Sequence, residues 1–245
     1  MPLTVKVFKA SALVVLASIA MALAASPARA DYASAKRNFE KLSGRTQTAI
    51  TLALIATGDF DGVIYFGFTR RFYKSIVSFE RGENLEPDGI LNDRELQRLE
   101  TIANAFYQTL GNAYYTHPVS GAKLLVPRSL FDTEESTAEG IIFSRSDQKL
   151  SLSFVAFPLA QKSFGELYAT LTAGTADRKV GYKRRFKSHF VATGTFRGRK
   201  FYTWINRLPD SSTGFTISWS ADWDETGRKI SALLANSFLA APTKG

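Results

Sequence analysis

One stretch, residues 45–99, contains in order the segments GDFDG (58–62), GFT (67–69), IVSFERG (76–82) and PDGILNDRELQRL (87–99). Its two Asp-Gly pairs predict tight turns, because glycine tolerates the left-handed backbone that such turns need. Between the turns, Phe72, Ile76 and Phe79 recur at spacings of three and four residues, which places them on one face of a helix. The stretch therefore predicts helices joined by two glycine turns.

The flanking helices have recognisable boundaries. The first helix is predicted from about Ala33 to Thr57, directly ahead of a glycine that stops it. The third helix is predicted to begin at Asn92, a good N-cap, because Glu95 follows three residues later and completes a capping box. Gly111 ends this helix, so the helical domain is expected to span residues 31–111.

This order of elements resembles the peptidoglycan-binding-like three-helix domain, in which two glycine turns separate three helices. The resemblance implies a non-catalytic groove, beside the first turn and the second helix, that binds the peptide or glycan part of the cell wall. The residues that it implicates are Asp59, Asp61, Tyr65, Phe66, Thr69 and Arg70. The chain departs from the family at Phe79-Glu80, where the family usually has Phe-Gln. The alternative is that the phenylalanines of this region form only the core of a small bundle.

The second turn has a competing interpretation. From Asn84 to Glu95 the spacing N-x-E-x-D-G-x-L-N-x-x-E places oxygen-bearing side chains where a calcium-binding EF-hand loop has its ligands. Against calcium, the loop starts with Asn instead of Asp, and Pro87 stiffens it. A tight turn at Asp88-Gly89 followed by the capping box explains the same residues.

After Gly111 the composition shifts to short aromatic and β-branched runs, with residues 112–117 as the expected linker and 118–245 as a second domain. Strands are predicted at 123–126, 140–144, 149–156, 179–186, 189–196, 200–206 and 214–220. Two helices interrupt or follow them, one opened by Ser163 with Glu166 and one from Asp224 to Phe238. The predicted fold class is α+β, a small N-terminal three-helix domain and a C-terminal antiparallel sheet covered by helices.

Two segments of this second domain, GAKLLVP (121–127) and GIIFSRSDQKLSL (140–152), resemble the PsbP/DcrB type of α/β sandwich. The resemblance implies a non-enzymatic binding or assembly module. The order of the two domains also resembles the front part of some exported alphaproteobacterial proteins, some of which continue into a trypsin-like protease. This chain is expected to stop where such a protease would begin.

The N-terminus has the pattern of a secretory signal peptide. Residues 1–30 combine Lys6 and Lys9, a short alanine-rich apolar run and an Ala-Arg-Ala site. Removing them takes away three of the 31 basic residues and no acidic one, which leaves 28 against 22 and a net charge of +6. We expect a periplasmic or secreted protein without a transmembrane segment after signal removal. The absence of cysteine shows that the fold uses no disulfide.

A basic run crosses one predicted strand. Lys179, Lys183, Arg185 and Lys187 have odd numbers, so a continuous strand would project them from one face and Tyr182 and Phe186 from the other. The four are candidates for anion binding, and an exported protein seldom meets nucleic acid. The alternative is a solvated face whose charges discourage edge aggregation. The predicted partner is peptidoglycan or another envelope polymer, and an envelope protein is a further candidate partner.

The sequence holds no pattern for catalysis or metal binding. A serine protease needs a serine, a histidine base and an aspartate, yet only His117 and His189 are present and no G-x-S-x-G segment occurs. With no cysteine and only two histidines, the sequence also lacks the ligand spacing of a zinc site. We therefore predict no catalytic residue, no metal and no cofactor. The alternative class is an enzyme, either a wall hydrolase with carboxylates distant in sequence or a protease-family remnant lacking its catalytic domain.

Overall fold

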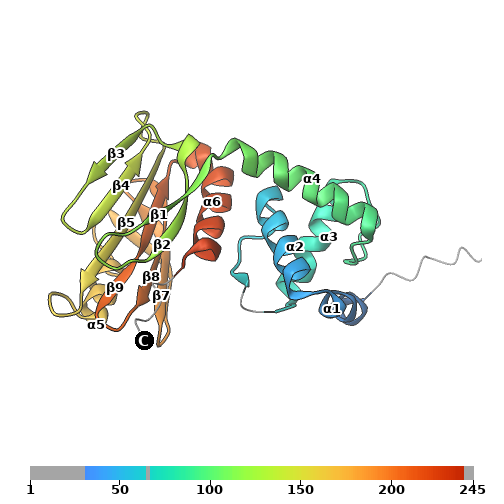
Figure 1. Ribbon diagram of the computed structural model, residues 1–245, viewed down its shortest axis with the longest axis horizontal. Coiled ribbons are helices and arrows are strands. Elements are labelled where there is room, and N and C mark those ends of the chain that lie inside the picture. Colours follow the sequence, from blue (N-terminus) through green and yellow to red (C-terminus); the bar gives the residue numbers. More distant parts are fainter. Residues whose placement is uncertain (1–30, 65–66, 240–245) are drawn as a thin grey trace, which may run out of the picture.

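The computed structural model describes residues 31–64 and 67–239. The predicted signal peptide, residues 1–30, lies outside the described residues, as do the candidate site residues Tyr65 and Phe66. Within the described ranges, no helix has the length and apolar character needed to cross a membrane. Figure 1 shows a group of helices on one side and a large sheet on the other, with helix α6 between them.

Four helices form the helical part: α1 (Tyr32–Lys41), α2 (Gly44–Thr57), α3 (Arg70–Gly82) and α4 (Asp93–Thr109). Each begins after a residue whose side chain accepts a backbone N–H, namely Asp31, Ser43, Thr69 and Asn92. The prediction of a single helix over 33–57 was wrong, because Leu42 has an extended backbone and Ser43 caps a new helix. The capping box of Asn92 and Glu95 is confirmed.

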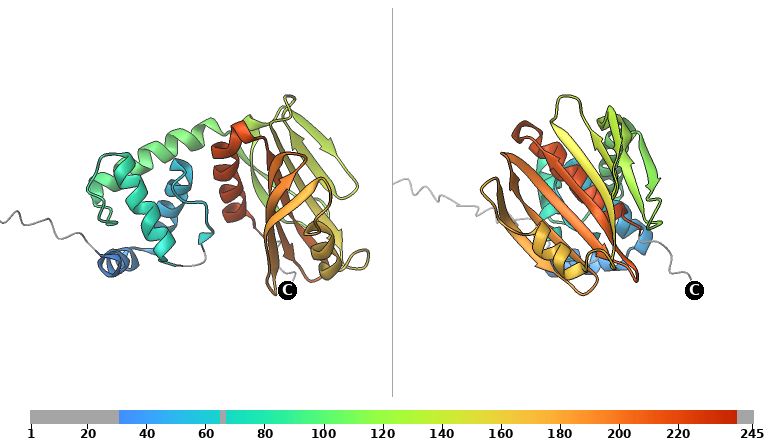
Figure 2. Two further views of the ribbon diagram at one scale, coloured as in Figure 1. Left: turned by 180° about the vertical axis from the view of Figure 1, so that it is seen from behind. Right: turned by 90° about the vertical axis from the view of Figure 1, so that its left-hand side faces the viewer.

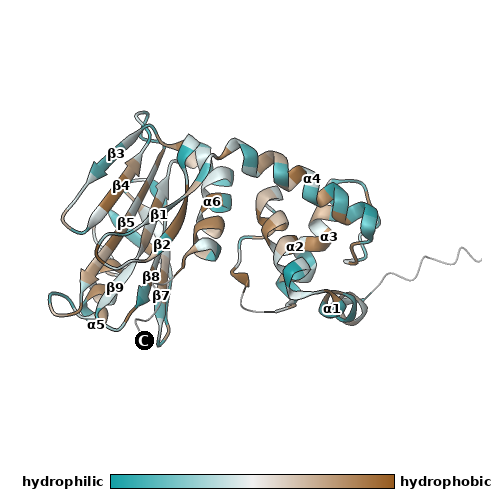
Figure 3. Ribbon diagram, in the orientation of Figure 1, coloured by the Kyte–Doolittle hydropathy of each residue, from teal (hydrophilic) through white to brown (hydrophobic). Residues whose placement is uncertain are grey.

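Phenylalanines from α1, α3 and the first glycine turn form the core of the helical part. Phe72 is the centre, with ring centroids 5.0 Å from Phe39, 5.2 Å from Phe60 and 5.6 Å from Phe68. Helix α4 alternates apolar and hydrophilic residues along its length (Figure 3), and its Leu99 is fully buried in the same core. The helical part is thus an amphipathic bundle around an aromatic centre.

Nine strands follow: β1 (Asn112–Thr116), β2 (Lys123–Pro127), β3 (Thr133–Ser136), β4 (Gly140–Ser144), β5 (Leu150–Pro158), β6 (Arg178–Arg185), β7 (His189–Phe196), β8 (Arg199–Arg207) and β9 (Ser211–Trp219). Strands β1 and β2 pair with each other, and the other seven form an antiparallel sheet in the order β3-β4-β5-β9-β8-β7-β6. The interval 112–117, expected as a linker, contains β1. The sequence did not predict β3, whose four residues are all exposed.

Two helices lie on opposite faces of the sheet (Figure 2): α5 (Phe164–Leu171) and α6 (Asp224–Ser237). Helix α5 covers a small area, where its Phe164 and Leu167 contact Phe190 and Ile205. Helix α6 shares the larger core with β5, β9 and the β1–β2 ribbon. The α+β fold class predicted from the sequence, helices first and then an antiparallel sheet covered by helices, is confirmed.

Helix α6 also joins the two parts of the molecule. Its Ala232 is buried in the core of the helical part, while Ile230 and Leu233 are buried against the sheet. The Asn236 side chain donates to the Gly62 carbonyl at 2.9 Å and accepts from the Ile64 backbone N–H at 2.8 Å. These contacts hold the first glycine turn against the helix that covers the sheet.

The contact between α6 and the sheet can be tested at Gly227. A Cβ at this position would overlap the Trp219 indole ring, so Gly227→Ala is expected to lower the free energy of unfolding by about 1–3 kcal/mol through overpacking. Gly82 is also helical but has open space around it, so Gly82→Ala is expected to raise stability by about 0.5–1 kcal/mol. Urea denaturation measures both. Equal stability of the two variants would contradict this packing.

Candidate functional site

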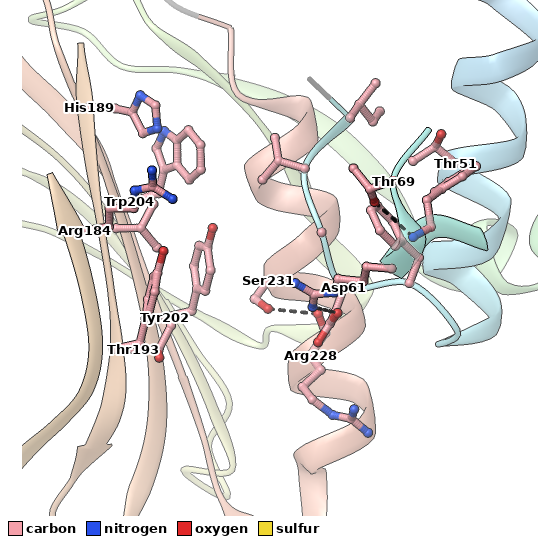
Figure 4. A pocket seen from close by; sticks show the side chains of 18 of the residues that line it. Thr51, Asp61, Thr69, Arg184, His189, Thr193, Tyr202, Trp204, Arg228 and Ser231 are labelled. Atoms are coloured by element: carbon pink, nitrogen blue, oxygen red, sulfur yellow. Dashed lines mark hydrogen bonds and ion pairs between the residues drawn. The ribbon is translucent and has the colours of Figure 1, made fainter. Parts of the chain in front are cut away.

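A cleft of about 1140 Å³ lies between the sheet and the helical part. Figure 4 shows its two sides, with the strands β6–β8 facing the first glycine turn and one edge of α6. The sheet wall is formed by Tyr182, Arg184, Phe186, His189, Val191, Thr193, Tyr202 and Trp204. The helical wall is formed by Gln47, Thr48, Thr51, Phe60, Asp61, Thr69 and Arg71. The cleft is therefore built from segments that are far apart in the sequence.

Three stacked rings form the upper sheet wall. His189 lies between Phe186 and Trp204, with centroid distances of 4.3 and 4.5 Å and nearly parallel planes. The Trp204 indole donates to the Asn206 side chain at 3.0 Å, which fixes its orientation. Burial lowers the pKa of His189, so its imidazole is neutral at pH 7. Arg184 continues the stack, with its guanidinium 4.7 Å over the Phe186 ring, so the stack carries a positive charge at one end.

Tyr202 lies below this stack on the same wall (Figure 4). Burial raises the pKa of its hydroxyl well above the usual value, with smaller contributions from Tyr182 and from Asp61 across the cleft. No described residue hydrogen-bonds this hydroxyl. Tyr182, on the edge strand β6, is 51% exposed. The wall therefore offers two phenol groups to a ligand.

Charged groups at the helical and α6 sides are paired. Asp61 forms an ion pair with Arg71 of α3. Asp224, at the start of α6, accepts from Lys200 at 2.8 Å and from the Trp219 indole at 3.0 Å. These hydrogen bonds, that of Lys200 first, lower the pKa of Asp224, so it stays ionised at neutral pH.

The residues implicated by the peptidoglycan-binding resemblance are distributed over several places. Asp61 and Thr69 line the cleft. Asp59 lines a separate hollow of about 400 Å³ beside α3 and α4. The Arg70 guanidinium lies 5.0 Å over the Tyr32 ring, away from the cleft. Arg71, next to Arg70, is one of the cations that line the cleft.

The basic residues of β6 are divided by a β-bulge. The register with β7 shifts between Val180 and Tyr182, which leaves Gly181 without a partner and reverses the alternation. Lys179 therefore points to the face opposite that of Lys183 and Arg185, and the expectation of one shared face was wrong. Lys187 lies beyond the end of the strand.

Sequence reasoning did not single out His189 or Asp224 as cleft residues. Tyr202 and Trp204 are two residues apart on β8, so the alternation of a strand places both side chains on the same face of the sheet. What the strand pattern could not show is that a helical turn more than a hundred residues away faces this wall.

No protein-family model and no curated protein matches the chain. Among solved structures, the solution structure of cyanobacterial PsbP (CyanoP) from Synechocystis sp. PCC 6803 is similar, at 14% sequence identity and a TM-score of 0.41. The matched region covers 53% of this chain and 92% of that chain. The PsbP/DcrB-type resemblance of the second domain rests on its sequence segments. The peptidoglycan-binding-like resemblance of the helical domain stays a prediction.

At the second Asp-Gly turn, side-chain oxygen atoms accept hydrogen bonds from backbone N–H groups. Asp88 accepts from the Ile90 N–H at 2.7 Å, and Asn92 and Glu95 accept each other's backbone N–H in the capping box. Within residues 31–64 and 67–239, no group of three or more acidic, histidine or cysteine side chains is arranged to hold a metal ion. These bonds favour the turn interpretation over the calcium loop.

Glu80 lies inside this turn and is fully buried. One carboxyl oxygen accepts from the Gly89 N–H at 2.8 Å, and the other has no hydrogen-bond partner among the described residues. Burial, together with Asp88 and Glu95 nearby, raises the pKa of Glu80 to about 7. The carboxyl is therefore neutral in mildly acidic solution.

This raised pKa predicts a pH-dependent stability. Between its ordinary value of 4.5 and about 7, the unfolded chain loses the Glu80 proton while the folded chain keeps it, so stability falls as pH rises. The loss is expected to be on the order of 3 kcal/mol. Glu80→Gln keeps the hydrogen-bond acceptor for the Gly89 N–H and should remove the dependence of stability on pH in this interval. Glu100→Gln, at an exposed position of α4, should leave that dependence unchanged. Urea denaturation at several pH values measures the slope, and an unchanged slope in Glu80→Gln would contradict the assignment.

Proposed function

We propose that the protein is a non-catalytic binding module of the cell envelope that docks on peptidoglycan through the cleft between its sheet and its helical part. The observation that carries this proposal is the sheet wall, where Tyr182, Tyr202 and the His189–Trp204 stack face a helical wall of mixed apolar and polar residues. A concave site with aromatic lining and a few polar groups is the usual form of a ligand site.

The chemistry of the two walls matches that of a glycan chain. Sugar rings have apolar C–H faces that stack on aromatic rings, and hydroxyl edges that need hydrogen-bond partners. The half-exposed ring of Tyr182 supplies the first, and the phenol groups of Tyr182 and Tyr202 supply the second. The volume of about 1140 Å³ is at the upper end of the usual range for small-ligand pockets, which favours several linked units over a single small molecule.

The carboxylates that line the cleft favour binding over hydrolysis. A glycosidase needs one carboxylic acid whose pKa is raised so that it can protonate the leaving group. Asp224 has a lowered pKa and is held by Lys200, and Asp61 is paired with Arg71. Both are arranged as fixed ionic partners that shape the walls.

The envelope location rests on the sequence. Residues 1–30 have the pattern of a secretory signal, and the remaining chain has a net charge of +6. A positive chain is attracted to anionic wall polymers at long range, and this attraction is weakened by salt. Charge alone would therefore give a salt-sensitive association, whereas docking in the cleft would persist.

Co-sedimentation with purified peptidoglycan sacculi tests this proposal. Tyr182→Ala removes an exposed ring from the cleft and is expected to weaken pelleting by about tenfold or more. Tyr114→Ala removes an equally exposed ring on β1, outside the cleft, and is expected to leave pelleting unchanged. Binding of the unchanged protein is expected to persist from about 50 mM to about 500 mM salt.

Three outcomes would contradict the proposal: no pelleting at either salt concentration, pelleting that the higher salt abolishes, or equal loss in the two tyrosine variants. The second would leave only charge as the cause of association. The third would show that an exposed ring anywhere on the surface has the same effect.

A further inference from the structure

A second feature lies on the opposite face of the sheet, at the end of its edge strand. Arg178, the first residue of β6, places its guanidinium 4.4 Å over the Phe201 ring. Its Nε atom is buried and has no hydrogen-bond partner among the described residues. Burial lowers the pKa of Arg178, because the charged form has lost part of its hydration.

Arg199, the first residue of β8, is also partly buried. Its Nη2 atom donates to the carbonyl and to the side-chain oxygen of Ser218, at 3.1 and 3.3 Å. Burial also lowers the pKa of Arg199. Within the described residues, neither Arg178 nor Arg199 forms an ion pair.

The strand register brings the two arginines together. Arg178 is paired with Phe196 of β7, and Phe196 is paired with Arg199 of β8. Directly paired residues on neighbouring strands project from the same face, so Arg178, Phe196 and Arg199 form one row. Phe201 lies two residues after Arg199 and shares this face. The row lies on the face away from α6 and the cleft.

The acidic groups nearest to this row have other partners. Asp177 is paired with Arg197 at 3.3 Å, and Asp147 is paired with Arg145 at 3.1 Å. Asp147 still acts on Arg199 through space and raises its pKa, which opposes the effect of burial. Two half-buried guanidinium groups without an ion pair carry a desolvation cost that an anion would offset. A guanidinium presents N–H donors in a planar fork that matches a tetrahedral or planar oxyanion.

We propose that Arg178, Arg199 and the Ser218 hydroxyl form a binding site for a phosphate group. The site is independent of the cleft and of the proposed docking on peptidoglycan. The sequence predicted a basic face of four residues in and beside one strand. The proposed site instead combines Arg178 of β6 with Arg199 of β8, which the β-bulge and the strand register place on the same face of the sheet. Because Phe196 beside it is 42% exposed, the site is open to a phosphate carried by a larger molecule as well as to free phosphate.

The first test is titration of the unchanged protein with inorganic phosphate, followed by amide NMR shifts, against sodium chloride of equal ionic strength. Phosphate is expected to shift the amides around residues 178, 199 and 218, and chloride is not. Absence of phosphate-specific shifts, or shifts confined to other strands, would overturn the proposal. This measurement does not depend on how well any variant folds.

The second test compares three variants by calorimetry with inorganic phosphate. Arg178→Gln and Arg199→Gln are expected to weaken binding by about tenfold or more. Arg207→Gln is the matched control, because it removes an exposed arginine from the same face of β8 at its other end. Equal loss in all three variants would show a general charge effect and would overturn the proposal.

Vesicles distinguish the two sources of phosphate. Phosphatidylcholine vesicles containing about one quarter phosphatidylglycerol offer headgroup phosphate together with negative surface charge. Flotation that Arg178→Gln and Arg199→Gln abolish, and Arg207→Gln does not, would support the site with a lipid headgroup as source. Phosphate binding without flotation would support the site with a soluble phosphate or phosphate ester as source.

Discussion

The burial of helix α6 on two sides is the constraint on which the rest of the structure depends. Residues 230–235 of this helix are all buried, which a helix at the surface of a single domain cannot achieve. One side contacts the sheet through Leu233 and the other contacts the helical bundle through Ala232. The helix thus belongs to both cores, and it fixes the separation between the bundle and the sheet (Figure 1).

The cleft exists because α6 covers only part of its face of the sheet. Strands β5 and β9 lie under the helix, whereas the edge strand β6 extends beyond it and leaves Tyr182 51% exposed. Asn236 then holds the Gly62–Ile64 backbone opposite these strands, so the first glycine turn becomes the second wall. The first glycine turn and strands β6–β8 are therefore parts of one cavity.

Local patterns in the sequence predicted most helices and strands, but they did not predict how these elements pack together. The capping boxes at Asn92 and Ser163 and the alternation along β4, β5, β7 and β8 predicted those elements. The break at Ser43 was missed because its serine cap interrupts an otherwise continuous helical pattern. Strand β3 was missed because its exposed residues 133–136 carry no apolar alternation. The cleft depends on contacts across more than a hundred residues, which no local pattern encodes.

The bulge at Gly181 shows how one unpaired residue changes the chemistry of two faces. In a continuous strand, Arg178 would share a face with Tyr182 and place its guanidinium in the cleft. With the bulge, Arg178 shares the far face with Lys183 and Arg185, while Tyr182 and Arg184 remain at the cleft. Lys183 donates to the Thr172 carbonyl and Arg185 lies over the rings of α5, so both are engaged in covering that helix. Arg178 lies over the Phe201 ring instead, and its buried Nε atom has no hydrogen-bond partner among the described residues.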